Sequence, residues 1–129
     1  MTFSNDLKKA ADKFKKKSDA RLRRIALASY QKINEQSPVD MGTFRANWLV
    51  SFNTLDRKFN EGLTSGDVQV AINNASAMIG KATVGTSVFI CNSVPYAIAL
   101  EHGHSQQALG GVVSPSTELI RNSISAGRL

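Results

Sequence analysis

Residues 4–36 read SNDLKKAADKFKKKSDARLRRIALASYQKINEQ, and this stretch decides the fold. Ser4 is placed to cap a helix at its start. Apolar or small residues then recur at a spacing close to the helical period of 3.6, while the lysines occupy the other faces. These residues are Leu7, Ala11, Phe14, Ser18, Leu22, Ile25, Ser29 and Ile33. Pro38 cannot continue a helix, so the pattern predicts one amphipathic helix that ends before it.

The helix is long for the chain that carries it. At about 1.5 Å per residue it spans on the order of 50 Å. A compact domain of 129 residues has a diameter of only roughly 36 Å. Either the helix kinks near residues 17–19, where the apolar pattern is weakest, or its free end projects beyond the body. We favour projection, and expect the free end to rest on another subunit or a partner.

The positive charge of the chain is concentrated on this helix. Residues 1–36 contain ten Lys and Arg against four Asp and Glu, and so carry the whole net charge of +6. A row of cations can bind phosphates without reading a base sequence. We therefore name a set of residues that could face DNA: Lys13, Lys15, Lys16, Lys17, Arg21, Arg23 and Arg24. An acidic neighbouring subunit or plain water are the alternatives.

The rest of the chain predicts strands followed by short helices. Residues 44–53 alternate between apolar and polar, as a half-buried strand does. Residues 86–92 predict a buried strand that pairs with the first one. Between them, residues 54–67 are typical of an exposed loop. Residues 68–79 fit a short helix ending near Gly80, although the first few also alternate like a strand.

The C-terminal part predicts a further strand end and one more helix. Residues 97–101 are expected to be extended and to lead into a polar loop. Ser114 and Pro115 then start a short amphipathic helix that Gly127 closes. We expect one α+β domain over residues 1–129, with a basic helix of residues 1–36 and a body of residues 37–129. In this fold the long helix packs on a small, mainly antiparallel sheet with one or two short helices.

Composition excludes several classes of protein. Apolar residues make up 42% and charged residues 20%, which are ordinary globular values. The N-terminus has no apolar signal region, and no window approaches the ~18 apolar residues of a membrane span, so we expect a soluble intracellular product. The single cysteine, Cys91, allows no disulfide within the chain and reads as a buried small hydrophobe.

The sequence gives no catalytic signature, and we expect neither an enzyme nor a bound cofactor. There is no GxSxG elbow and no glycine-rich phosphate loop. Glu101, His102 and His104 form the one cluster of metal-ligand type, but a third protein ligand is not evident. A polar loop bonded to backbone groups or to a neighbouring subunit is the interpretation that we favour.

Two separated motifs carry a resemblance to a known family. The first is SPVDMGTFRANW at residues 37–48, which reads as a turn entering a strand; the second is NSVPYAIALEHGHSQQALGGVV at residues 92–113. Together they resemble the tailed-phage neck and tail-completion family of head-to-tail joining proteins, of the minor tail protein Z type. The matching residues are Pro38, Asp40, Gly42, Arg45, Trp48, Asn92, Pro95, Tyr96, Ala97, Glu101, Gly103, Ser105, Gln106, Gln107 and Ala108.

The resemblance implies a structural virion protein. Copies form a ring in the neck, commonly sixfold, that joins the head-side connector or stopper to the tail terminator or tube, with genomic DNA passing through its centre. Such a protein is assembled in the host cytoplasm and ends in the virion, without contact with a membrane. Two other functions stay open: a tail terminator or minor tail component, and a basic nucleic-acid-binding module without sequence specificity.

Docking residues are expected mainly in the loop of residues 101–111, which is polar and bounded by glycine. Arginine and aromatic side chains dominate interface energetics, which adds Arg45 and Tyr96, and Asp40 of the first motif completes the set. The candidates are Asp40, Arg45, Tyr96, Glu101, His102, Gly103, His104, Ser105, Gln106 and Gln107. Trp48 lies on the apolar face of the expected strand, and we assign it to the core.

Overall fold

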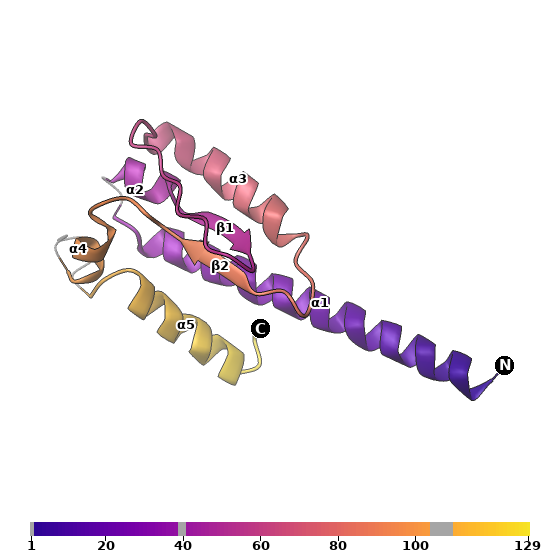
Figure 1. Cartoon of the computed structure of the whole chain (residues 1–129). Coiled ribbons are helices and arrows are strands. Elements are labelled where there is room, and N and C mark those ends of the chain that lie inside the picture. Colours follow the sequence, from indigo (N-terminus) through magenta and orange to yellow (C-terminus); the bar gives the residue numbers. More distant parts are fainter. Residues whose placement is uncertain (1, 39–40, 104–109) are drawn as a thin grey trace.

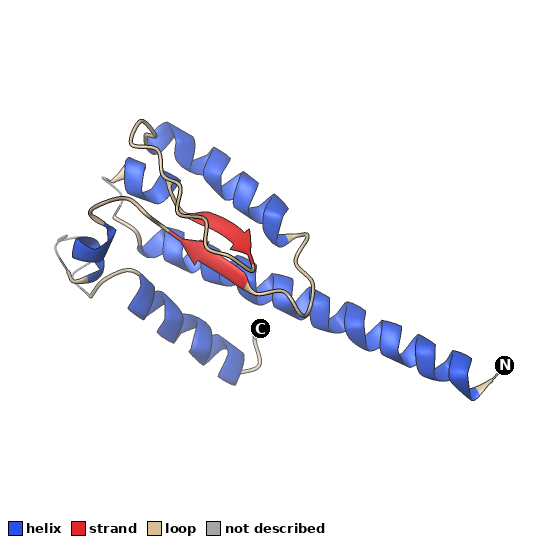
Figure 2. Ribbon diagram, viewed as in Figure 1, coloured by secondary structure: helices blue, strands red, loops and turns tan. Residues whose placement is uncertain are grey.

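The computed structural model describes residues 2–38, 41–103 and 110–129. A two-stranded antiparallel sheet lies along the C-terminal half of one long helix, and two shorter helices flank it (Figure 1). The elements are α1 (Phe3–Gln36), α2 (Gly42–Ala46), β1 (Leu49–Phe52), η1 (Ser65–Asp67), α3 (Val68–Ile79), β2 (Val88–Cys91), α4 (Ala97–Glu101) and α5 (Val113–Ser125). The expected α+β class is therefore confirmed, and Figure 2 shows how helices dominate it.

Helix α1 runs without interruption and ends where the sequence predicts. Its N-cap is Thr2, whose Oγ1 accepts a hydrogen bond from the N–H of Asn5 at 3.3 Å, so the prediction of Ser4 as the cap was wrong. Thr2 has the extended backbone that a cap requires, whereas Ser4 already lies in the first turn. At the other end Ser37 is extended and closes the helix just before Pro38.

Strands β1 and β2 pair in the predicted antiparallel arrangement, with Leu49 opposite Cys91 and Phe52 opposite Val88. The first strand is shorter than expected, because residues 42–46 form helix α2. Phe44 and Trp48 are both buried, and their spacing of four residues suits one helical face as well as one strand face. The alternation in this motif therefore could not separate the two structures.

The expectation of an extended segment at residues 97–101 was also wrong. These residues form the short helix α4, in which the N–H of Leu100 bonds to the carbonyl of Tyr96 at 3.1 Å. Leu100 is buried in the core and Ala97 packs against the same cluster, so these apolar side chains hold this turn of helix. The predicted helices α3 and α5 are present, and α5 begins one residue before Ser114.

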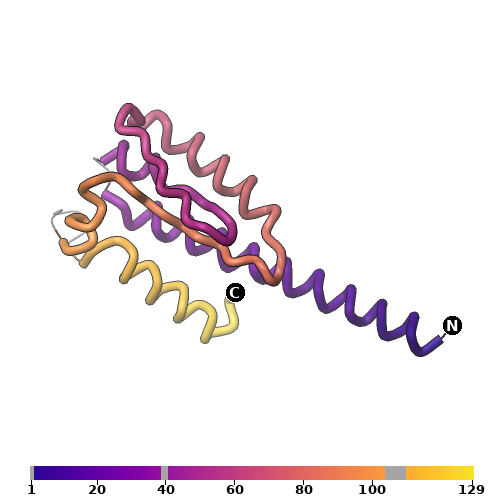
Figure 3. Tube along the Cα trace, viewed as in Figure 1, coloured from indigo at the N-terminus to yellow at the C-terminus, as the bar shows by residue number. Residues whose placement is uncertain are grey.

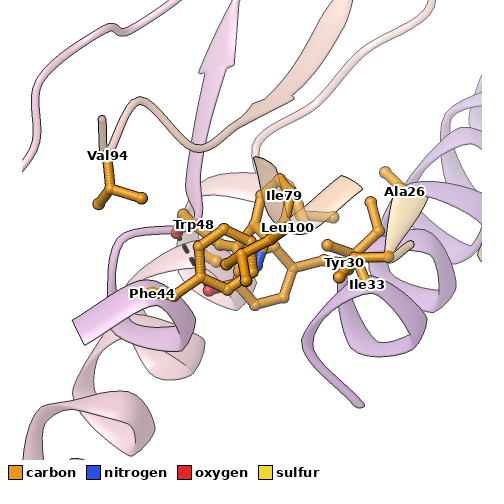
Figure 4. Packing of buried hydrophobic residues seen from close by; sticks show 10 residues of the cluster. Ala26, Tyr30, Ile33, Phe44, Trp48, Ile79, Val94 and Leu100 are labelled. Carbon is orange, nitrogen blue, oxygen red and sulfur yellow. Dashed lines mark hydrogen bonds between the residues drawn. The ribbon is translucent and has the colours of Figure 1, made fainter. Parts of the chain in front are cut away.

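The core gathers around Tyr30 and Trp48 (Figure 4). The Tyr30 side chain is fully buried, and its hydroxyl donates to the carbonyl oxygen of Trp48 at 3.2 Å. The indole of Trp48 donates to Oγ of Ser37 at 2.9 Å and meets the ring of Phe44 edge to face at 5.4 Å. The assignment of Trp48 to the core is confirmed. From α1 the buried side chains come only from its C-terminal half.

Candidate interaction site

The N-terminal half of α1 projects from the body. Every residue from 2 to 17 is exposed, and this segment, here called the overhang, extends on the order of 24 Å. The body first bonds to α1 at Asp19, whose Oδ1 accepts from the N–H of Val84 at 2.8 Å, and at Arg23. Figure 3 shows the overhang leading away from all other elements. The expected projection beyond the body is confirmed.

Three large apolar side chains are exposed on one side of the overhang. The exposed fraction is 80% for Phe3, 58% for Leu7 and 73% for Phe14. At 3.6 residues per turn these side chains lie within about 40° of one another around the helix. We call them the apolar stripe. Isolated exposed apolar residues are ordinary, whereas an aligned set on a projecting element is a candidate contact surface.

The other sides of the overhang are basic. Its six lysines outnumber Asp6 and Asp12, and neither of the two ion pairs found among the described residues involves this segment. Of the residues predicted to face DNA, six are exposed: Lys13, Lys15, Lys16, Lys17, Arg21 and Arg24. Arg23 differs, since its Nε donates to the carbonyl of Ala82 at 2.7 Å and so holds the α3–β2 loop against α1.

The two sequence motifs meet in space around α2. The side-chain amide of Asn92 donates to the carbonyl of Phe44 at 2.7 Å, and the rings of Phe44 and Tyr96 lie 6.4 Å apart. Tyr96 is half-buried, and burial raises the pKa of its hydroxyl, with a smaller effect from the charge of Glu61. Arg45, another docking candidate, is half-buried and bonds within the protomer to Asn34.

Glu101 caps helix α5 from outside that helix. One carboxylate oxygen accepts from the N–H groups of Val112 and Val113 at 2.9 and 2.8 Å, and the other accepts from the N–H and hydroxyl of Ser114 at 3.0 and 3.1 Å. Partial burial by itself raises the pKa of Glu101, but these hydrogen bonds outweigh it and hold the pKa below its ordinary value. Both oxygens of this docking candidate are thus engaged inside the protomer.

This role was missed in the sequence, although a signal was present. The N-cap residue of α5 is Val112, which has no side-chain oxygen. A helix start without a capping side chain leaves N–H groups unpaired and needs an acceptor from elsewhere. Gly111 allows the close approach, because it has a φ of +87° and an added Cβ would overlap the backbone and carboxylate of Glu101.

The remaining docking candidates divide into two groups. His102 is exposed at the end of α4, and Gly103 follows with a φ of +82°, a backbone conformation that favours glycine. The others lie outside the described residues: Asp40, His104, Ser105, Gln106 and Gln107. Within the described ranges, no three His, Cys, Asp or Glu side chains are grouped so as to hold a metal ion.

A groove that the sequence did not predict lies between β1 and α3. It has a volume of about 360 Å³ and is mostly apolar, with walls that include Trp48, Val50, Leu63, Val70, Ala75 and Met78. Val70 stands at its rim with an exposed fraction of 57%. Asp67 is the one ionisable residue among those lining the groove.

Comparisons with protein families, curated proteins and solved structures find no match to this chain. Across residues 2–38, 41–103 and 110–129, no helix is both long enough and apolar enough to cross a bilayer.

Proposed function

We propose that the protein is a structural subunit of the tailed-phage neck, in which copies form a ring that joins the head connector to the tail. The observation that carries the proposal is the overhang with its apolar stripe, which the body of the same protomer leaves uncovered. The resemblance of residues 37–48 and 92–113 to the tail-completion family adds the location in the neck.

An uncovered helix is costly to the protein. A helix segment of this length is marginal in water unless its apolar side is packed. Each of Phe3, Leu7 and Phe14 would contribute about 1.5–3 kcal/mol if it were buried. Neighbouring lysines on the same segment repel one another. A partner that covers the stripe would offset both effects. A subunit with such an arm is suited to assembly rather than to catalysis.

The neck assignment is tested by locating the protein in virions. Gold-labelled antibody against it should mark the junction of head and tail, and disruption of its gene should yield filled heads and separate tails. Label at the far end of the tail would instead favour the minor tail component, and label at the tail side of a complete neck would favour the terminator. Normal virions without the protein would contradict all three structural roles.

A second candidate function is binding of nucleic acid without sequence specificity. The overhang carries a net charge of +4, from six lysines against two aspartates, and its lysines are exposed. When binding to phosphates releases counterions, the logarithm of the affinity falls linearly with the logarithm of the salt concentration. The slope is roughly −0.9 for each phosphate contacted on duplex DNA. Replacement of Lys13, Lys15, Lys16 and Lys17 by glutamine should abolish such binding, and an unchanged slope would exclude the overhang as the site.

A further inference from the structure

We propose that the overhang of one copy seats its apolar stripe in the β1–α3 groove of a second copy. The inference rests on the proposed function in one respect, namely that copies of the chain assemble. It goes further by naming the two unlike surfaces that meet. The stripe consists of Phe3, Leu7 and Phe14, and the groove is the one lined by Trp48 and Val70.

The chemistry of the two surfaces matches. The stripe offers two phenyl rings and a leucine side chain, and the groove is mostly apolar. Its lining includes Ala71 and Ala75, whose small side chains allow a second helix to approach α3 closely. Val70 and Met78, from the same helix, also line the groove. An aromatic side chain entering between them would cover apolar surface on both partners.

The spacing of two stripe residues, Leu7 and Phe14, also matches the length of the groove. Leu7 and Phe14 are seven residues apart, which corresponds to about 10 Å along a helix. Val70 and Met78 are eight residues apart on α3, which corresponds to about 12 Å. Two side chains of the stripe can therefore occupy the groove at the same time.

The charge of the overhang favours contact with the groove of a second copy and disfavours contact with a second overhang. Helix α3 contains no charged residue, and the single ionisable group lining the groove is the acid Asp67. The overhang, with its charge of +4, meets no cation there. Pairing of two overhangs would instead bring +4 against +4, and like charges at helix contacts are destabilising. A groove lined by one acid and by no cation is the better partner for a basic arm.

The contact must form between two protomers. The overhang continues the axis of α1 and leaves the body before Asp19, and in Figure 1 it points away from α3. A straight helix cannot turn back to reach the groove of its own chain. A contact between unlike faces of identical subunits generates a closed ring or an open filament, according to the rotation between neighbours.

Crosslinking between two single-cysteine proteins tests the contact. Both are full-length and carry Cys91→Ser, to remove the native thiol. One adds Phe14→Cys or Leu7→Cys, and the other adds Val70→Cys. Because these three positions are exposed, the substitutions leave folding intact. With a short bismaleimide reagent, a mixture of the two proteins should give a crosslinked heterodimer for at least one of the stripe positions.

Two matched controls lie on the same helices but outside the proposed contact. Lys16→Cys replaces the cysteine of the stripe and lies on the opposite side of α1. Gln69→Cys replaces Val70→Cys and lies outside the residues that line the groove; both native residues are exposed. Crosslinking should be at least about tenfold weaker for either control. In sedimentation, Phe14→Ser should weaken self-association at least about tenfold, since burial of one such side chain is worth that much or more, whereas Lys16→Ser should leave it unchanged.

Three outcomes would overturn the inference. These are a stripe-to-stripe crosslink in the Phe14→Cys protein alone, crosslinking no stronger than in the controls, and self-association that Phe14→Ser does not weaken. None of these outcomes affects the immunogold test of whether the protein lies at the neck of the virion. A correctly located protein without the crosslink would refute the overhang-in-groove contact alone, and a crosslinked protein absent from virions would refute the neck function alone.

Discussion

Arg45 and Asn34 bond to each other in both directions. Nε and Nη2 of Arg45 donate to the backbone carbonyl of Asn34 at 3.0 and 2.7 Å, and the Asn34 side-chain amide donates to the carbonyl of Arg45 at 3.3 Å. Asn34 is buried in the last turn of α1, where carbonyl groups lack helical partners. The pair therefore fastens α2, and the motif that contains it, to the end of the long helix.

Replacement of Arg45 by alanine should lower the free energy of unfolding by about 1.5–3 kcal/mol, the usual contribution of a hydrogen bond to a charged group. Urea denaturation measures the change. Arg57→Ala is the matched control, because Arg57 is exposed, and it should stay within about 0.5 kcal/mol of the unsubstituted protein. Equal stability of the two variants would mean that Arg45 is free to serve a partner, as the sequence suggested.

Replacement of Glu101 by glutamine should lower the free energy of unfolding by about 0.5–2 kcal/mol at neutral pH, the range for loss of a helix cap. An amide has one acceptor oxygen, so either the pair of N–H groups at Val112 and Val113 or the two donors of Ser114 would lose their acceptor. Circular dichroism during urea denaturation measures the loss. Glu118→Gln, on the exposed side of the same helix, is the control.

The same substitution should change the response to acid. The pKa of Glu101 is held below its ordinary value of 4.5 in the folded protein. As the pH falls, the carboxylate is therefore protonated in the unfolded chain before it is protonated in the folded one. The contribution of Glu101 is fully present above pH 4.5 and is lost as the pH falls through the folded pKa. The stability gap between the native and Glu101→Gln proteins should accordingly narrow below pH 4.5. A gap that stays constant down to acid unfolding would rule out the charged cap.

Gly42 to alanine should be strongly destabilising, although Gly42 has an ordinary backbone conformation. An added Cβ would overlap the backbone of Ser65, so α2 and η1 would have to separate. We expect the substitution to lower the free energy of unfolding by about 1–3 kcal/mol, as at other overpacked sites. Gly66→Ala, whose Cβ would meet only the Thr64 hydroxyl at 3.6 Å, should be nearly neutral. Thermal unfolding of the two variants makes the comparison.

The elements that periodicity predicted well are those fixed by many residues. The long repeat in α1, the stop at Pro38 and the pairing of β1 with β2 all follow from the sequence. Short segments were misread, because a single turn such as α4 has too few residues to reveal a period. Around α2, the burial of Phe44 and of Trp48, which follows the helix, suits either structure.

Contacts between distant segments could not be predicted at all. The bonds from Glu101 to α5 and from Arg45 to Asn34 depend on tertiary geometry. Both residues were predicted to be docking candidates: Glu101 because it starts a polar loop, and Arg45 because arginine side chains contribute strongly to interfaces. The overhang could be predicted, since it follows from helix length against domain diameter, whereas the groove between β1 and α3 required the packed structure.

Deletion of residues 2–17 should leave the body of the protein nearly as stable as before. All of these residues are exposed, and bonding to the body begins at Asp19, so the free energy of unfolding should change by less than about 0.5 kcal/mol. Self-association should be lost. A full-length control with Phe3→Ser, Leu7→Ser and Phe14→Ser keeps the lysines and removes only the apolar stripe. If it assembles as well as the native chain, charge and not apolar contact drives association. If instead the deletion unfolds the body, the overhang supports its own protomer and requires no partner.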